Sequence, residues 1–308
     1  MPYLCGFWRF ANAYVIFLMK GEKGMYSIWL LEYCHVPTQP IGSVLSGQHN
    51  AGFRELSFTY MVLKGNGLNI LIDTGTDGND PVTQAYHKRD SVTNWHSPEE
   101  VLKKVGLKPE DINYVLITHA HYDHMDNLKA FPNAKFIIQE KELLGWVWAM
   151  TRPRKFRAPH MALKSQNIYE ALHLVEEERM TMVDGDVKDI LPDIDLKAAF
   201  DGHTFGSQAI VINNEDGPWV NVGDMAYVRE NLTGFNNDGV YVPVGLAVGT
   251  PYNITKSIDE VIDLVGGKLN RIIIGHETDN WDIYPSKKCE DGLYMAEIAL
   301  AEGETSKL

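Results

Sequence analysis

The sequence predicts an α/β protein in which two β-sheets face each other and helices cover their outer surfaces. Short apolar runs rich in β-branched residues recur along the chain, and segments with helical patterns lie between them. The order of strands followed by a helix occurs twice, which favours two packed sheets with helices outside. The chain has 308 residues, of which 44% are hydrophobic, so it is long enough and apolar enough to bury a large core.

The predicted strands form two series. They are bounded by turn residues such as Gly, Asn and Asp. The first series covers residues 26–33, 58–65, 68–75, 113–118 and 134–139, and the second covers residues 194–200, 208–213, 218–224 and 271–277.

Two segments carry the signals of a helix start. Residues 97–107 open on Ser97 followed by acidic residues, which is typical of an N-terminal cap. Residues 257–267 open on Ser257 in the same way and end on glycines. Both are predicted to lie outside the sheets.

Residues 145–185 are predicted to be a helical insertion rather than part of a sheet. They are rich in Trp, Met and other aromatic residues and contain a cluster of basic residues between positions 152 and 157. Such a segment can wall a substrate pocket or contact another subunit in a homo- or hetero-oligomer. An ordinary solvated helical excursion is an equally good interpretation.

We expect residues 25–308 to form a single domain preceded by an extension, residues 1–24. The apolar run of this extension is interrupted by Arg9 and Asn12, and it lacks a basic leader and a cleavage site. Three widely spaced cysteines suggest no disulfide framework, so a cytoplasmic location is expected. The formal charge of −13 argues against nucleic acid as a partner. A small-molecule substrate is expected, and no membrane.

The stretch "THAHYDHMDN", residues 118–127, is the strongest functional signal. It follows the predicted strand at residues 113–118 and holds four side chains suited to a divalent metal within six residues: His119, His121, Asp123 and His124. Because side chains alternate along an extended backbone, the first three are expected to converge on one side. The sequence therefore predicts a metal site here.

Three further candidates follow later strands. His203, Asp224 and His276 each come where an apolar run ends. Five histidines and two aspartates are too many ligands for one four-coordinate zinc that must also hold a water. Two divalent ions bridged by Asp224, with a shared hydroxide as the nucleophile, account for the number and indicate a hydrolase.

With these residues identified, the chain resembles the metallo-β-lactamase fold superfamily. "HAHYDH", the later ligands and "LIDTG" at residues 71–75 carry the resemblance. It implies a four-layer αββα sandwich with a dinuclear centre at one edge. It also implies how the ligands divide: His119, His121 and His203 on one ion, Asp123, His124 and His276 on the other, and Asp224 between them.

Within the superfamily, residues 107–143 and "DMAYVREN" at residues 224–231 are most similar to the N-acyl homoserine lactone lactonases. The resemblance implies that Tyr227 stabilises the oxygen that becomes anionic and that Asp123 also moves a proton to the leaving oxygen. The antibiotic-degrading members carry a cysteine in place of Asp224, and diiron members carry a glutamate in place of His121, so both activities are disfavoured.

The resemblance leaves the substrate and the metals open. Lactone or ester hydrolysis is preferred; the alternative is an aromatic substrate such as an activated aryl ether, followed by a phosphodiester or a non-catalytic binding role. Zinc is the first choice of metal, but the ligands also suit Mn²⁺, Fe²⁺ and Co²⁺. Relatives commonly have "HTPGH" around the third histidine, whereas this chain has "HTFGS" with Phe205 and Ser207. Residues 35–56 and 145–185 are expected to border the pocket.

Overall fold

The computed structural model describes residues 25–308; the predicted extension, residues 1–24, lies outside the described residues. Two sheets form the centre of the molecule. The larger has eight strands in the order β12-β13-β1-β2-β3-β4-β5-β6, and the smaller has five in the order β11-β10-β9-β8-β7. The strands are β1 Ser27–Pro40, β2 Phe53–Gly65, β3 Leu68–Ile72, β4 Tyr114–Leu116, β5 Lys135–Gln139, β6 Met180–Val183, β7 Val187–Leu191, β8 Ile194–Phe200, β9 Gly206–Asn214, β10 Gly217–Asn221, β11 Ile272–Ile273, β12 Ser286–Lys288 and β13 Tyr294–Ala299.

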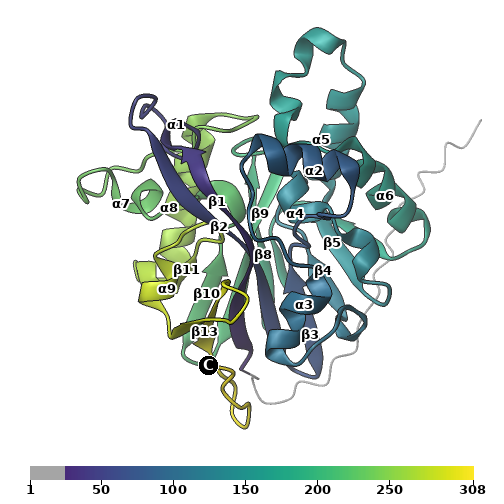
Figure 1. Ribbon diagram of the computed structural model, residues 1–308, viewed down its shortest axis with the longest axis vertical. Helices are drawn as coiled ribbons and strands as arrows, with labels where there is room; N and C mark the ends of the chain where they lie inside the picture. The colour runs from purple at the N-terminus through teal and green to yellow at the C-terminus, as the bar shows by residue number, and fades with distance from the viewer. Residues whose placement is uncertain (1–24) are drawn as a thin grey trace, which may run out of the picture.

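Helices cover the outer faces of both sheets. In Figure 1, α2 to α6 lie on one side of the sheets and α7 to α9 on the other. The helices are α1 Ile41–Val44, α2 Pro81–Arg89, α3 Pro98–Leu102, α4 Tyr122–Met125, α5 Glu140–Met150, α6 Ser165–Glu176, α7 Glu230–Thr233, α8 Pro251–Leu264 and α9 Asn280–Ile283.

Alternation along β1 shows how the layers are held together. Ile28 and Leu30 belong to a cluster that joins residues of both sheets, including Ile210 of β9, so they point between the sheets. Trp29 and Leu31 belong to a second cluster that includes the helix residues packed on the outside. Because successive side chains of a strand point to opposite faces, each central strand is buried on both sides. The predicted αββα arrangement is confirmed.

Strand direction places several loops at one edge of the sandwich. β3, β4, β5 and β6 pair in parallel, so their carboxyl ends meet at the same edge. In the smaller sheet β10 and β11 are also parallel neighbours. The loops that leave β3, β4, β10 and β11 therefore gather into one region.

Of the two predicted helix starts, one is confirmed and the other is wrong. Ser97 accepts a hydrogen bond from the Glu100 backbone in a capping box, and α3 follows it. The second helix begins earlier than expected, at Pro251, where the Thr250 hydroxyl accepts a hydrogen bond from Asn253 N, and Ser257 lies inside it. A Thr cap followed by Pro is the stronger start signal, and the buried residues continue the helical pattern from there.

The prediction for residues 145–185 needs a correction. The segment contains most of α5, two short 3-10 turns and α6, so it is largely helical. However, α5 begins at Glu140, and Met180–Val183 forms β6, which pairs in parallel with β5 at the sheet edge. Four residues carry too little pattern to be recognised as a strand, and the pairing with β5 fixes their conformation.

Within residues 25–308, no helix combines the length and the apolar character that crossing a bilayer requires.

Candidate metal centre

The "THAHYDHMDN" stretch changes conformation within a few residues. β4 ends at Leu116, His119 and His121 lie in the loop that follows, and Asp123 and His124 lie in the short helix α4. The expectation that His119, His121 and Asp123 share one side of an extended strand is therefore wrong. The turn into α4 instead directs Asp123 together with His124.

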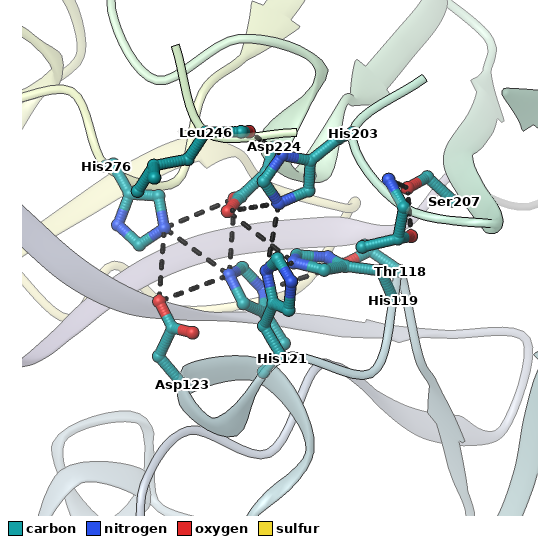
Figure 2. A network of polar contacts seen from close by, with 12 residues as sticks. Thr118, His119, His121, Asp123, His203, Ser207, Asp224, Leu246 and His276 are labelled. Carbon is teal, nitrogen blue, oxygen red and sulfur yellow. Dashed lines mark hydrogen bonds and ion pairs between the residues drawn. The ribbon is translucent and has the colours of Figure 1, made fainter. Parts of the chain in front are cut away.

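The three later candidates reach the same place from the smaller sheet. His203 lies in the turn between β8 and β9, Asp224 in the 3-10 turn Gly223–Met225 after β10, and His276 after β11. Figure 2 shows the predicted side chains converging on Asp224. They form two groups of potential ligand atoms that share Asp224, each within 4.8 Å of one another.

The first group, called here the three-histidine group, consists of His119, His121 and His203. The His121 Nδ1 atom lies 3.1 Å from His119 Nε2 and 3.0 Å from His203 Nε2. Asp224 Oδ2 completes the group, at 3.5 Å from His119 Nε2 and 3.2 Å from His203 Nε2.

The second group, called here the carboxylate group, consists of Asp123, His124 and His276. Asp123 Oδ2 lies 3.5 Å from His124 Nε2 and 3.6 Å from His276 Nε2. Asp224 Oδ1 lies 3.2 Å from each of the same two nitrogens. The two oxygens of Asp224 thus face different groups.

These spacings fit metal ions. Ligands about 2.0–2.1 Å from a tetrahedral zinc are separated from one another by about 3.3 Å, which is close to the distances found in both groups. Asp224 is buried, yet neither of its oxygens accepts a hydrogen bond from any group in residues 25–308. A buried carboxylate that faces imidazole nitrogens at 3.2 to 3.5 Å without accepting a hydrogen bond is costly, and an ion on each side of it would reduce that cost.

The far side of most imidazoles is held by a hydrogen-bond acceptor. His124 Nδ1 donates to Asp73 Oδ2 at 2.7 Å, His203 Nδ1 to Leu246 O at 2.8 Å, and His276 Nδ1 to Ser57 O at 2.9 Å. These bonds hold a proton on Nδ1 and turn Nε2 toward the centre, so that Nε2 is the nitrogen that an ion would bind once that atom carries no proton.

Asp73 links the two groups. Its Oδ1 accepts from Thr118 N at 2.7 Å, and its Oδ2 accepts from the Thr118 hydroxyl at 2.8 Å as well as from His124. Since that hydroxyl donates to Asp73, it is free to accept from His119 Nδ1, 3.0 Å away. Asp73 itself has a positive φ of 62°, which aims its side chain back toward the loop after β4.

The electrostatics of the two groups differ. Burial and the neighbouring His124 hold the pKa of His119 well below its usual value, and burial with His203 lowers the pKa of His121 to about 3. Burial also acts to lower the pKa of His124, but Asp224 and the other carboxylates around it raise it well above the usual value. The pKa of His276 is raised in the same way: burial acts to lower it, and Asp224 and Asp123 together outweigh burial.

Comparison with known families identifies the superfamily. The profile of the Metallo-beta-lactamase superfamily matches residues 54–276, well over half of the chain. The chain belongs to the metallo-beta-lactamase superfamily. All seven side chains of the two groups lie within the matched range.

Several relatives within the superfamily are N-acyl homoserine lactonases. An N-acyl homoserine lactonase from Bacillus sp. is 29% identical over 133 residues, which is 43% of this chain and 46% of that protein. The chain thus spans about half the length of this curated relative. A structure of an N-acyl homoserine lactone hydrolase with a product bound at its catalytic metal centre aligns with a TM-score of 0.63 at 20% identity, covering 84% of this chain and 96% of that one. A dizinc quorum-quenching lactonase aligns with a TM-score of 0.60 at 17% identity, covering 88% and 94%.

Tyr227 lies against both groups of the superfamily centre. Its ring stacks on His276, with 5.0 Å between centroids and an interplanar angle of 17°, and meets His203 edge-on at 5.8 Å. Burial, followed by the nearby Asp224 and Asp123, raises the pKa of Tyr227 well above its usual value. The phenol is therefore protonated at neutral pH and can donate a hydrogen bond.

The turn that departs from the superfamily pattern, "HTFGS", is held by its own hydroxyls. Ser207 Oγ accepts from Thr204 N at 3.1 Å and pairs with the Thr204 hydroxyl at 2.6 Å. Phe205 packs edge-on against Trp146 of α5, with 5.1 Å between centroids. Trp146 in turn lies 5.9 Å from the His121 ring, so the segment after Gly145 reaches the centre through this indole.

The segment between β1 and β2 contacts the centre indirectly, through the backbone of Leu246. Ser43 O accepts hydrogen bonds from Gly245 N at 3.0 Å and Leu246 N at 2.9 Å. Leu246 O is the acceptor for His203 Nδ1.

Sequence reasoning missed two buried acids that support the centre. Asp73 lies in the quoted "LIDTG" motif, where an acid before a turn residue was a usable signal. Glu142 lies in an ordinary helical stretch and gives no local signal, yet it is buried and reaches the loops of the three-histidine group.

Proposed function

We propose that this protein is a dinuclear metal-dependent hydrolase that opens a lactone or cleaves a related ester. The observation that carries the proposal is Asp224, a buried carboxylate without hydrogen-bond partners in residues 25–308, whose two oxygens face two separate groups of ligand atoms. His119, His121 and His203 would hold one ion, and Asp123, His124 and His276 the other. Zinc is the first choice for both.

Such a pair of ions supplies an activated water at neutral pH and polarises a substrate carbonyl. Two features of the chain would determine where the ions and the activated water lie. Asp224 sets the separation of the two groups, and the hydrogen bonds to Asp73, Leu246 and Ser57 keep the imidazoles in one orientation.

Tyr227 and Asp123 are proposed to act on the substrate oxygens. The protonated phenol of Tyr227, stacked on His276, is placed to donate to the carbonyl oxygen as it becomes anionic. Asp123 is the more exposed of the two aspartates in the groups, so it is the one placed to pass a proton to the leaving oxygen.

Lactone opening is favoured by the relatives. The N-acyl homoserine lactonase from Bacillus sp. shares 29% identity over 133 residues, and the D-x-x-Y pattern of Asp224 and Tyr227 matches that group. The substrate class is inferred from this similarity, whereas the hydrolytic chemistry is supported by the geometry of the two groups.

The connection between α5 and α6 supports a contact with a second copy of the chain. In Figure 1 it projects at the top of the molecule. Trp148 in the last turn of α5 is 57% exposed, and Phe156 and Met161 in the connection are 55% and 54% exposed. Light scattering on the purified protein and on a Trp148→Glu variant checks this: a dimer that dissociates in the variant is expected, and a monomeric unaltered protein contradicts it.

The substrate is tested with protein reconstituted with zinc. A pH-stat follows proton release from N-acyl homoserine lactones of different acyl lengths, and parallel assays use p-nitrophenyl acetate, an activated aryl ether and bis-p-nitrophenyl phosphate. One proton released per lactone is expected. Turnover of the aryl ether or the phosphodiester without turnover of any lactone would refute the proposal and select the corresponding alternative.

A further inference from the structure

Glu142 is a buried acid that none of the preceding chemistry uses. It lies in the first turn of α5, and its side chain is 0% exposed. Its carboxylate accepts hydrogen bonds from Ala120 N at 2.8 Å, Trp146 Nε1 at 2.8 Å, the Thr204 hydroxyl at 2.7 Å and Gly206 N at 2.6 Å. An ionised carboxylate offers about four acceptor positions, so its capacity is filled.

Three of the four donors belong to the segments that carry the three-histidine group. Ala120 lies between His119 and His121, and Thr204 and Gly206 follow His203 in the next turn. One carboxylate oxygen accepts from the loop after β4 and from Trp146, and the other accepts from the turn before β9. Glu142 therefore joins two segments that are more than eighty positions apart in sequence.

Two glycines allow this close approach. A Cβ on Gly206 would lie 2.2 Å from Glu142 N, and a Cβ on Gly145 would lie 2.5 Å from the Phe205 side chain. Helix α5 and the "HTFGS" turn are thus in direct contact on both sides of the carboxylate. The position of the turn depends on α5 rather than on the smaller sheet alone.

Trp146 adds a packing contact to the same group. Its indole N–H is fixed by Glu142, and its ring lies 5.9 Å from the ring of His121. His121 faces the centre through Nδ1. The orientation of this imidazole therefore rests on the indole, which Glu142 holds in place.

We propose that Glu142 is a positioning residue that sets the metal affinity of the three-histidine group and leaves that of the carboxylate group largely unchanged. The selectivity follows from the contacts: three of the four donors to Glu142 lie in the segments of His119, His121 and His203, and the fourth, Trp146, packs against the His121 ring. The carboxylate group relies on Asp73 and Ser57 instead. This inference rests on the two-ion centre proposed above but not on the identity of the substrate.

The test compares Glu142→Gln with Glu297→Gln. Glu297 is a matched control because it is nearly buried and accepts from an indole, Trp29 Nε1, and from a backbone amide, Lys307 N, in a distant part of the fold. The two dissociation constants for zinc are measured by competition with a chromophoric chelator, and bound Co²⁺ is followed by its visible spectrum. Glu142→Gln is expected to weaken one ion by about tenfold to a hundredfold and to leave the other within about twofold.

An amide at position 142 would turn an NH₂ group toward donors, so a less disruptive pair accompanies it. Thr204→Val removes the single hydroxyl among the four donors to Glu142 and keeps the side-chain shape, whereas Thr204→Ser keeps the hydroxyl. Thr204→Val is expected to weaken the same ion several-fold, and Thr204→Ser is expected to restore it. If Glu142→Gln does not fold, the comparison of Thr204→Val with Thr204→Ser tests the proposed role of Glu142 instead.

A merely structural role predicts different results. It would lower the thermal unfolding temperature of the metal-free protein without changing the ratio of the two dissociation constants, and that result would overturn the proposal. Equal weakening of both ions would overturn it too, as would fewer than two ions bound by the unaltered protein. Absence of lactone turnover would refute only the proposed substrate, because the affinity measurement needs none.

Discussion

The two groups of ligands share Asp224 but are supported in different ways. The three-histidine group has imidazoles whose pKa values are lowered at His119 and His121, and its loops are joined by Glu142. The carboxylate group has imidazoles whose pKa values are raised at His124 and His276 by the surrounding carboxylates. The first group is therefore ready to bind a cation as it stands, whereas the second must release protons to do so.

This difference shows that similar residues become different ligands according to what lies behind them. His119 and His124 are five positions apart, yet Asp73 contacts His124 directly and reaches His119 only through the Thr118 hydroxyl. A carboxylate behind an imidazole raises its basicity, while a neutral hydroxyl does so much less. The two ions are thus expected to differ in affinity and in pH dependence.

The largest fall in kcat is expected when Asp224, the ligand shared by the two groups, is replaced. Asp224→Asn should lower kcat by about a thousandfold, because both groups lose a charged ligand at once. Asp216→Asn, in the turn before β10 and paired with Arg271 at the surface, is the control and should leave kcat unchanged. Steady-state kinetics and metal analysis measure the outcome; a kcat within tenfold of normal in Asp224→Asn would refute the shared ligand.

Removing one ligand from each group separates them. His119→Ala and His276→Ala should each lower kcat by about a hundredfold and reduce the metal content toward one ion per chain. Elemental analysis after gel filtration measures the content, with His173→Ala, an exposed position on α6, as the control. Loss of both ions in either variant would show that the groups do not bind independently.

Asp73→Asn tests the carboxylate behind His124. The amide has one acceptor oxygen, so it cannot accept from Thr118 N and from His124 Nδ1 at the same time, and the affinity of the carboxylate group should fall by about tenfold to a hundredfold. The three-histidine group, which Asp73 reaches only through Thr118, should change less. Asp195→Asn, a buried aspartate of β8 held by Lys188 and Asn213, serves as the control. An equal fall at both ions would contradict the comparison.

Tyr227→Phe removes one hydrogen-bond donor but no metal ligand. It should lower kcat by about tenfold to a hundredfold, while both ions stay bound. Tyr169→Phe, at an exposed tyrosine on the outer helix α6, is the control. Unchanged kcat, or loss of metal, would remove Tyr227 from the proposed chemistry.

Lowering the pH is the smallest change expected to separate the zinc affinities of the two groups. A raised pKa means that His124 and His276 keep protons that the ion must displace, so the affinity of the carboxylate group should begin to fall close to neutral pH. The lowered pKa values of His119 and His121 keep those nitrogens neutral to a lower pH. Zinc titrations between about pH 7.5 and 5.5 should show one ion lost before the other. Simultaneous loss would contradict the assignment.

The sequence by itself predicted which side chains gather into the two groups. Seven ligand-type side chains follow the ends of apolar runs, and their number alone indicated two ions, because one four-coordinate zinc cannot use them all. Alternating apolar runs likewise predicted two buried sheets with helices outside. These features are local, so they can be read from residue type and spacing.

The division of these residues was already implied by the family resemblance, but only the tertiary structure decided how they are supported. The turn into α4 places Asp123 with His124, where extended spacing placed it with His119 and His121. β6 exists because β5 offers it an edge to pair with. Glu142 and Asp73 act on segments distant in sequence. A hydrogen bond across such a distance depends on the packing of whole elements, and no local pattern specifies that packing.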